Sequence, residues 1–183
     1  MNREEALAAV KAKVANENSV KHMLAAEAIM RALARRFGED EEEWGLAGLL
    51  HDIDLELFGG DMNVHSRMGS DMVKELGASA AIAQAIICHN ETHGLPRQTK
   101  MDKALFCADP VTGLITATAL VMPDKKLGSV APSSVKKRFK AKGFAAGANR
   151  DNIAKCSELG IELDEFIEIG LKAMQGIAPA LGL

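Results

Sequence analysis

Apolar residues recur along the chain at the three- and four-residue spacing of an α-helix. In a segment that begins near Ser19, one helix face carries residues at positions i, i+4, i+7 and i+11, namely His22, Ala26, Ile29 and Leu33. No stretch alternates convincingly between apolar and polar residues, which is the pattern of a half-buried strand. The pattern predicts an all-α protein.

Capping residues, glycines and prolines divide this pattern into separate helices. Asn2 with Glu5 and Asp40 with Glu43 have the spacing of capping boxes, and Pro110 is expected to kink or break the longest helix. The predicted helices cover approximately residues 2–16, 19–37, 40–51, 65–76, 79–89, 101–122, 149–156 and 164–179, with a short basic helix from residue 132. Because no internal repeat or long linker is present, we expect a single domain over residues 1–183.

The composition fits a soluble domain. Of the 183 residues, 48% are hydrophobic and 26% are charged, and a net charge of −3 does not predict nucleic-acid binding. The N-terminus is charged and no apolar run approaches the roughly 18 to 20 residues of a membrane helix, so neither a signal peptide nor a membrane partner is expected. Cys88, Cys107 and Cys156 lack a CxxC spacing, which predicts a reducing, cytoplasmic setting.

Histidines and aspartates provide the candidate chemistry. Four of the five histidines fall on, or at the end of, separate predicted helices, and helical bundles build metal sites from side chains that project inward from facing helices. Two aspartates add carboxylates, and this mixture suits iron, manganese or zinc better than calcium or magnesium. The six candidate ligands are His22, His51, Asp52, His65, His89 and Asp109.

Each of these residues also has a purely structural interpretation. A histidine near an apolar face is more often a hydrogen-bonded core residue than a ligand. Asp109 could cap a helix that begins at Val111, and Asp52 could cap a helix or pair with a lysine. The joint arrangement favours a site, because the structural interpretation would need a separate accident at each position.

The order of the candidates resembles that of the HD superfamily of metal-dependent phosphohydrolases. In that family a lone histidine precedes an adjacent His-Asp pair and a distant aspartate, which here are His22, His51-Asp52 and Asp109. Two-metal members insert two more histidines, as His65 in HSRMG and His89 in IICHN would be. The resemblance covers about residues 20–115 and points to the small HDIG-type hydrolases, although the motif here reads HDID.

The resemblance implies an HD-type helical bundle that hydrolyses a phosphate ester or anhydride with a metal-activated water. It implies two divalent transition-metal ions, iron or manganese, with zinc, nickel, cobalt or magnesium as alternatives. Asp52 would bridge the ions, and Asp52 and His51 are the predicted catalytic residues. One ion would be held by His22, His51, Asp52 and Asp109, and the other by Asp52, His65 and His89.

Three polar residues near the motif have no assigned ligand role. We interpret Asp54 and Glu56 as solvated loop acids, with orientation of a ligating histidine as the alternative. His93 follows His89 by four residues, so it could lie at the mouth of the site as a proton donor or phosphate contact. The alternative for His93 is a surface position in the turn before Gly94.

A basic segment follows the proposed metal core and defines the C-terminal part, residues 132–180. Such a run is often only a solvated face, but cations near a metal site could hold the phosphates of an anionic substrate. Small hydrolases that resemble this chain carry a similar lysine-rich segment, ending in Phe-Ala and Asn-Arg. With His93, the predicted substrate contacts are Lys136, Lys137, Arg138, Lys140 and Arg150.

The sequence therefore predicts a metal-dependent phosphohydrolase, a phosphomonoesterase, phosphodiesterase or pyrophosphohydrolase. A branch of the family that cleaves diadenosine tetraphosphate symmetrically has the same six-ligand order, so a nucleotide or nucleotide polyphosphate is the expected substrate. The alternatives are an HD-type di-iron oxygenase, because ligand types alone do not distinguish it, and a non-catalytic nucleotide-binding module. A homodimer is a further option that the sequence leaves open.

Overall fold

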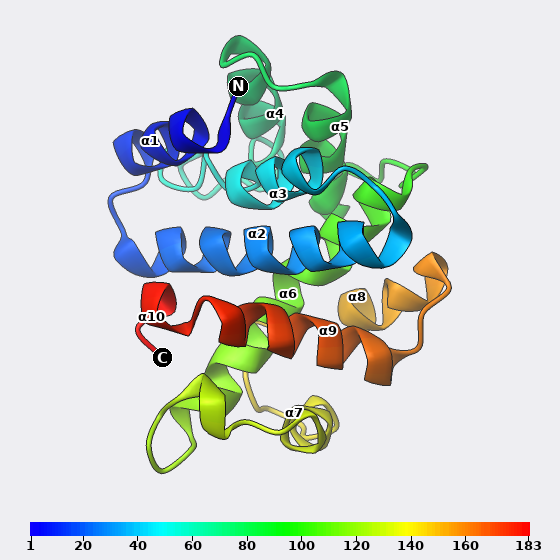
Figure 1. The fold of residues 1–183 in the computed structure, drawn as a ribbon. Helices are drawn as coiled ribbons and strands as arrows, with labels where there is room; N and C mark the ends of the chain where they lie inside the picture. Colours follow the sequence, from blue (N-terminus) through cyan, green and yellow to red (C-terminus); the bar gives the residue numbers. More distant parts are fainter.

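The helix α2 (Glu17–Phe37) is the central element of the computed structural model, which describes residues 1–183. The helix α3 (Glu41–Leu50) lies along one side of α2 and α9 (Leu163–Gly176) along the other, while α6 (Lys100–Leu120) crosses behind them (Figure 1). Asn16 caps the N-terminus of α2, and Gly38 ends it with a left-handed φ of 69°.

The remaining elements surround this centre, and the chain contains no strand. The all-α prediction is therefore confirmed. The other α-helices are α1 (Arg3–Lys13), α4 (Arg67–Glu75), α5 (Ala80–His89), α7 (Pro132–Phe139), α8 (Arg150–Ala154) and α10 (Ala178–Leu181). Three short 3-10 helices are η1 (Glu91–His93), η2 (Leu127–Ser129) and η3 (Lys155–Leu159). No helix is both long enough and apolar enough to span a membrane.

The structure corrects several predicted helix ends. Helix α6 continues through Pro110, because buried residues on both sides of the proline, such as Phe106 and Leu114, hold the two halves in one core. Asp109 therefore lies inside α6 and does not cap a helix that begins at Val111.

Other ends differ by a few residues. The first helix stops at Lys13, three residues before its predicted end. The fourth begins at Arg67 rather than His65, because Ser66 adopts a left-handed conformation with φ 64°. The last long helix begins at Leu163, with Glu162 rather than Asp164 at its N-cap.

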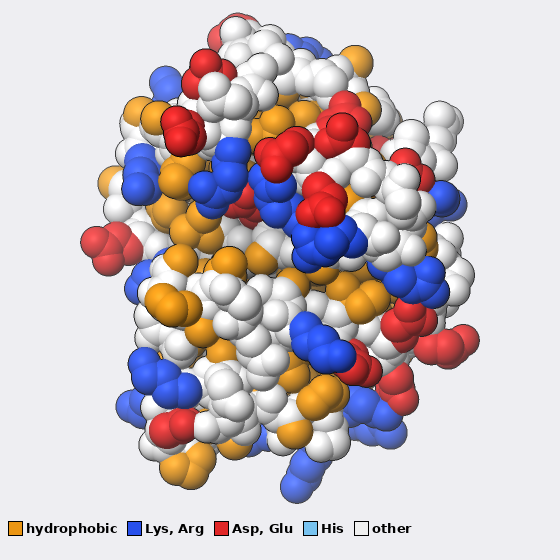
Figure 2. Space-filling view, in the orientation of Figure 1, with side chains coloured by type: hydrophobic (Ala, Val, Ile, Leu, Met, Phe, Trp, Pro, Cys, Tyr) orange, Lys and Arg blue, Asp and Glu red, His pale blue; other side chains and the backbone are white.

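The charged side chains of α2 and α3 form a surface band, in which acidic and basic groups alternate (Figure 2). Arg31 donates hydrogen bonds to Glu27 in its own helix and to Glu42 in α3. Arg3 of α1 donates to Glu27, which is 3% exposed. These ion pairs connect α1, α2 and α3 through polar side chains that lie outside the apolar core.

Gly48 allows α3 to approach the backbone of α2. A Cβ atom at this position would lie 2.7 Å from the carbonyl oxygen of Ala26 and 2.8 Å from the backbone nitrogen of Glu27. Because these are backbone atoms, they cannot move aside as a flexible side chain would. The close approach of the two helices positions the C-terminal end of α3, and His51 and Asp52 come directly after this end.

We expect Gly48→Ala to lower the free energy of unfolding by about 1 to 3 kcal/mol or more, because α3 must move away from α2. Urea unfolding followed by circular dichroism measures the change. The matched control is Gly128→Ala, because a Cβ there meets nothing within 4 Å. Equal stability of the two variants would show that the contact between α2 and α3 is not close.

Candidate metal centre

All six predicted ligands come together between the N-terminal half of α2 and the middle of α6. They reach the centre from different elements, and three of them, His51, Asp52 and His65, lie just outside a helix. His51 is the C-cap of α3, and His65 lies in the turn before α4. The complete set is His22 of α2, His51 and Asp52 after α3, His65, His89 at the end of α5, and Asp109 of α6.

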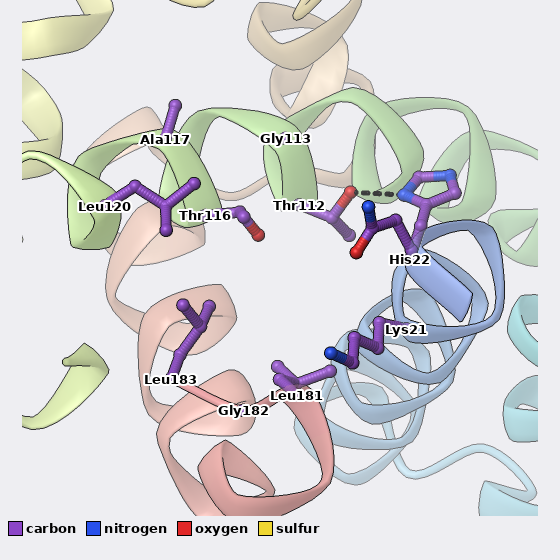
Figure 3. Close-up of a pocket in the computed structure, with 11 residues that line it drawn as sticks. Lys21, His22, Thr112, Gly113, Thr116, Ala117, Leu120, Leu181, Gly182 and Leu183 are labelled. Carbon is purple, nitrogen blue, oxygen red and sulfur yellow. Dashed lines mark hydrogen bonds between the residues drawn. The ribbon is translucent and has the colours of Figure 1, made fainter. Parts of the chain in front are cut away.

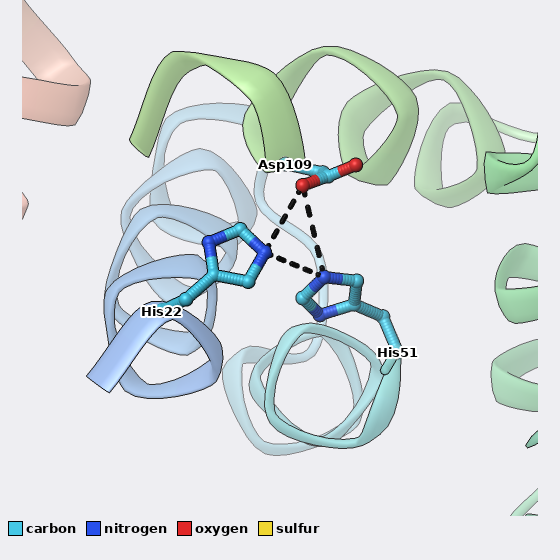
Figure 4. Close-up of side chains that lie close together, drawn as sticks. All are labelled: His22, His51 and Asp109. Carbon is cyan, nitrogen blue, oxygen red and sulfur yellow. Dashed lines mark hydrogen bonds and ion pairs between the residues drawn. The ribbon is translucent and has the colours of Figure 1, made fainter. Parts of the chain in front are cut away.

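Three of these side chains form a tight group at one end of the centre (Figure 4). The Nε2 atom of His22 lies 3.1 Å from Nε2 of His51 and 3.1 Å from Oδ1 of Asp109. The distance from His51 Nε2 to Asp109 Oδ1 is 3.8 Å. Bonds of about 2.0–2.2 Å to one metal ion place neighbouring ligand atoms roughly 3 to 4 Å apart, so these spacings fit a shared ion.

Asp52 lies between this group and the two remaining histidines. Its Oδ2 atom is 3.4 Å from His51 Nε2 and 3.6 Å from His22 Nε2. Its Oδ1 atom is 3.4 Å from His65 Nε2 and 3.5 Å from His89 Nε2. The two carboxylate oxygens thus face two different sets of ring nitrogens, and Asp52 neither caps a helix nor pairs with a lysine.

In three of the four histidines, the ring nitrogen that faces away from the centre, Nδ1, forms a hydrogen bond with the protein. Nδ1 of His51 and Nδ1 of His89 donate to the backbone carbonyls of Gly48 and Ile86, at 2.8 and 2.6 Å. Nδ1 of His65 lies 3.0 Å from Oδ1 of Asp54. Since the partners are acceptors, the Nδ1 atoms carry the protons, and each Nε2 lone pair points to the centre.

The fourth histidine is oriented by a hydroxyl. Thr112 Oγ1 donates to the carbonyl of Asp109 at 2.7 Å, so it accepts from His22 Nδ1 at 2.8 Å. Sequence analysis did not identify Thr112. Its position three residues after Asp109 on one helix face was the available signal.

This arrangement requires a positive charge at the centre. Two Nε2 lone pairs 3.1 Å apart repel each other unless a proton or a metal ion lies between them. Burial alone would lower the pKa of His51, but the carboxylates of Asp52 and Asp109 and the bond to Gly48 raise it to about 9. A proton therefore occupies this place when no metal does, and a metal ion must displace it on binding.

The two carboxylates stay ionised. Burial alone would raise the pKa of Asp52, but the charge and hydrogen bond of His51 hold that pKa well below its usual range. For Asp109 the effect of burial is likewise outweighed by His22, so its pKa is lowered. Four imidazoles and two carboxylates are a donor set that fits divalent transition metals.

Asp54 is buried, which corrects its interpretation as a solvated loop acid. Its side chain is inaccessible, and besides holding His65 it accepts from the backbone N–H groups of Ser66 at 2.7 Å and Gly69 at 3.0 Å. Gly69 permits this approach, because a Cβ there would lie 3.2 Å from the Asp54 carboxyl carbon. Asp54 thus holds the strained backbone at Ser66 and orients the adjacent histidine.

We expect Asp54→Asn to weaken metal binding by about 10- to 100-fold, the usual effect of altering a group that orients a ligand. An amide has one acceptor oxygen in place of two, so it cannot accept with separate oxygens from His65 and from the N–H groups of Ser66 and Gly69, and His65 would lose its anionic partner. Metal affinity measured by competition with a chelating dye tests this. The control is Glu56→Gln, because Glu56 is exposed and contacts only backbone near Asn16. Equal affinities in both variants would contradict the orienting role.

His93 contacts the segment that carries His65 and is not simply a surface turn residue. Its Nε2 lies 2.8 Å from the carbonyl of His65 and 3.0 Å from Ser66 Oγ, and its Nδ1 accepts from Arg67 Nε at 3.2 Å. Both ring nitrogens therefore have protein partners. A role as proton donor or phosphate contact stays a prediction.

The basic segment lies apart from the ligands. Lys136 pairs with Asp164, and the Arg138 guanidinium lies 5.5 Å from the Phe144 ring centroid. Lys140 and Lys142 line a pocket of about 440 Å³ that includes none of the six ligands. Substrate contact by Lys136, Lys137, Arg138 or Lys140 therefore stays a prediction.

Arg150 orders the loop that follows α7. Arginine has five N–H donors, and here its guanidinium donates to five backbone carbonyls. No donor is left for a substrate phosphate, so we reinterpret Arg150, predicted to contact substrate, as a structural residue. The acceptors are the carbonyl oxygens of Arg138, Phe139, Phe144, Ala145 and Ala148.

The comparisons with known proteins agree with this centre. The family model described as HD domain matches residues 20–113, just over half of the chain and a range that includes all six candidate ligands. Curated relatives match part of the chain. Ribonuclease Y of Oleidesulfovibrio alaskensis is 29% identical over 98 residues, and Ribonuclease Y of Nitratidesulfovibrio vulgaris is 30% identical over 98 residues. Each match covers 54% of this chain but only 18% of the relative. No solved structure matches the chain significantly.

Proposed function

The chain belongs to the HD superfamily of metal-dependent phosphohydrolases, and from this premise we propose that it hydrolyses a phosphate ester or anhydride of a nucleotide or nucleotide polyphosphate. The observation that supports this most is the convergence of four Nε2 lone pairs and two ionised carboxylates on one centre.

We propose two divalent transition-metal ions, because Asp52 faces two sets of ring nitrogens with different oxygens. When bound, such ions lower the pKa of a water molecule and stabilise charge on the phosphoryl oxygens. One site would use His22, His51, Asp52 and Asp109, and the other Asp52, His65 and His89. We propose iron or manganese, with zinc, nickel, cobalt or magnesium as alternatives, because histidine and carboxylate donors accept several of these metals.

The protein residues fix the donors and limit access to them. The side chains of His51, His65 and His89 are 0%, 7% and 3% exposed, so water and substrate do not approach from their side. His22 and Asp109 are 27% and 32% exposed. The substrate must therefore approach past His22 and Asp109.

Elemental analysis of protein purified without added metal, followed by a phosphate-release screen with manganese or iron, tests the proposal. We expect close to two equivalents of metal and hydrolysis of nucleoside phosphates. Because the curated relatives are ribonucleases, the panel includes a short oligoribonucleotide. Metal-free protein, or oxygen consumption without phosphate release, would overturn the proposal.

A further inference from the structure

The basic segment separates the charge of the chain into two parts. Residues 125–150 contain eight lysines and arginines and no acidic residue. The chain as a whole has 22 basic and 25 acidic residues, which leaves 14 basic and 25 acidic residues outside this segment. An otherwise acidic protein therefore carries one strongly basic stretch, and an anionic partner would be attracted to that stretch and repelled by the rest of the surface.

Most cations of this segment face the solvent. In α7, Val135 is buried and Phe139 is half-buried, and the helix packs against α6 and α9. Lys136 pairs with Asp164. Five other lysines are exposed and have no carboxylate within 4 Å, namely Lys125, Lys126, Lys137, Lys140 and Lys142. No acidic side chain of the protein pairs with these five charges.

Two apolar side chains project where this segment begins. Leu120 and Val121, at the C-terminal end of α6, are 49% and 53% exposed, more than any other large hydrophobic residue of the chain. Lys125 follows Val121 by four residues, and the intervening Asp124 accepts from the hydroxyl of Ser129. The end of α6, the turn after it and α7 form the lower end of the molecule in Figure 1, where Figure 2 shows basic and hydrophobic side chains together.

Leu120 also connects this end to the metal centre. It lines a pocket of about 480 Å³ that includes His22, and Thr116 continues the same wall of α6 between them (Figure 3). Thr112, which accepts from His22 Nδ1, belongs to that wall as well. The accessible side of the metal centre therefore adjoins the end of the molecule that carries the exposed lysines.

We propose that this end of the protein binds the surface of a membrane that contains anionic lipids. We name it the basic face and define it as the five unpaired lysines together with Leu120 and Val121. Clusters of about four to eight basic residues are typical of segments that bind anionic lipids, and each residue contributes roughly fivefold to the affinity. Aliphatic side chains beside them can enter the boundary between head groups and acyl chains.

Binding to a membrane surface needs no spanning helix. The short apolar runs, from which we expected no membrane partner, therefore do not exclude it. Because Leu120 belongs both to the basic face and to the pocket beside His22, binding would also place the accessible side of the metal centre near the lipid head groups.

A strand of nucleic acid fits the basic face less well. Proteins that bind single strands without sequence preference stack the bases on aromatic side chains, which the basic face lacks. The aromatic residues of the segment, Phe139 and Phe144, are half-buried. The guanidinium groups of Arg150 and Arg138 already lie 6.0 and 5.5 Å from the centroids of these two rings. The projecting side chains are aliphatic, which favours lipid over a nucleic-acid base.

Co-sedimentation of the whole chain with vesicles tests the proposal, with phosphatidylcholine alone or mixed equally with phosphatidylglycerol. One variant combines Lys125→Gln with Lys126→Gln, and the other is Val121→Ser. None of these residues is a candidate metal ligand or a predicted substrate contact. Circular dichroism checks that the variants are folded.

The matched controls lie outside the basic face. Lys11→Gln with Lys13→Gln removes two exposed, unpaired lysines of α1, at the other end of the molecule (Figure 1). Leu76→Ser removes an exposed leucine at the end of α4.

We expect the unmodified protein and the controls to bind the anionic vesicles and not the neutral ones. The double lysine variant should bind roughly 10- to 30-fold more weakly, and Val121→Ser roughly 3- to 10-fold more weakly. Raising the salt concentration from about 0.1 M to 1 M should release the protein, because the Debye length falls from about 10 Å to 3 Å.

No binding to anionic vesicles at about 0.1 M salt, or unchanged binding in either variant, would overturn the proposal. A single-stranded oligoribonucleotide is the competing probe. If it bound while the vesicles did not, and the double lysine variant lost this binding, the basic face would belong to nucleic acid and the proposal would be wrong. These measurements need neither metal nor phosphate release, so their result is independent of the proposed function.

Discussion

The Asp52→Ala variant is expected to lose phosphohydrolase activity by on the order of a thousandfold or more, well beyond the 10- to 100-fold effect of changing a group that only orients a ligand. Asp52 is the one side chain whose two oxygens face both sets of ring nitrogens. Without it, the remaining ligands lose the anion that joins His51 to His65 and His89.

The loss should reflect the site and not the fold. Asp52 belongs to no helix, and the packing of α3 on α2 does not depend on it. We therefore expect an unchanged circular dichroism spectrum together with less than one equivalent of metal by elemental analysis. Asp71→Ala is the control, because Asp71 is an exposed aspartate that pairs only with Lys74. Wild-type kcat in Asp52→Ala would show that the reaction takes place elsewhere in the protein.

The candidate ligands could be predicted because each is a histidine or aspartate in, or next to the end of, a helix that the sequence pattern indicates. The His51-Asp52 pair ends an apolar run, and His89 ends another, so their placement follows from helix boundaries alone. The predicted helix ends near Lys13 and Arg67 are wrong by two or three residues. Errors of this size do not turn His51, Asp52 or His89 away from the core.

The residues that support the ligands depend on contacts between segments that the pattern does not describe. Asp54 stands in a turn with other acids, and only the return of the chain at Ser66 and Gly69 buries it. Arg150 donates to backbone carbonyls, and the pattern of side chains along the sequence does not predict the direction in which a carbonyl points. The pocket beside His22 likewise combines residues from opposite ends of the chain.

Removal of the metal ions is expected to lower Tm by about 8 to 16 °C. At a metal concentration about a thousand times Kd, binding to the native state alone stabilises it by about 4 kcal/mol. For a domain of 150–250 residues, each kcal/mol corresponds to about 2 to 4 °C in Tm. The physical source is the centre itself, where Nε2 atoms 3.1 Å apart and two ionised carboxylates need a cation between them.

Calorimetric melting before and after dialysis against a chelator measures this shift, with metal content determined on the same samples. Asp52→Ala serves as the matched variant: since it lacks the carboxylate that faces both sets of nitrogens, its Tm should change little on chelation. Re-addition of manganese or iron should restore the Tm of the unmodified protein but not that of the variant. If complete removal of metal left the Tm of the unmodified protein unchanged, the proton on His51 would stabilise the metal-free centre as much as the metal ions do. Metal binding would then make no net contribution to the stability of the fold.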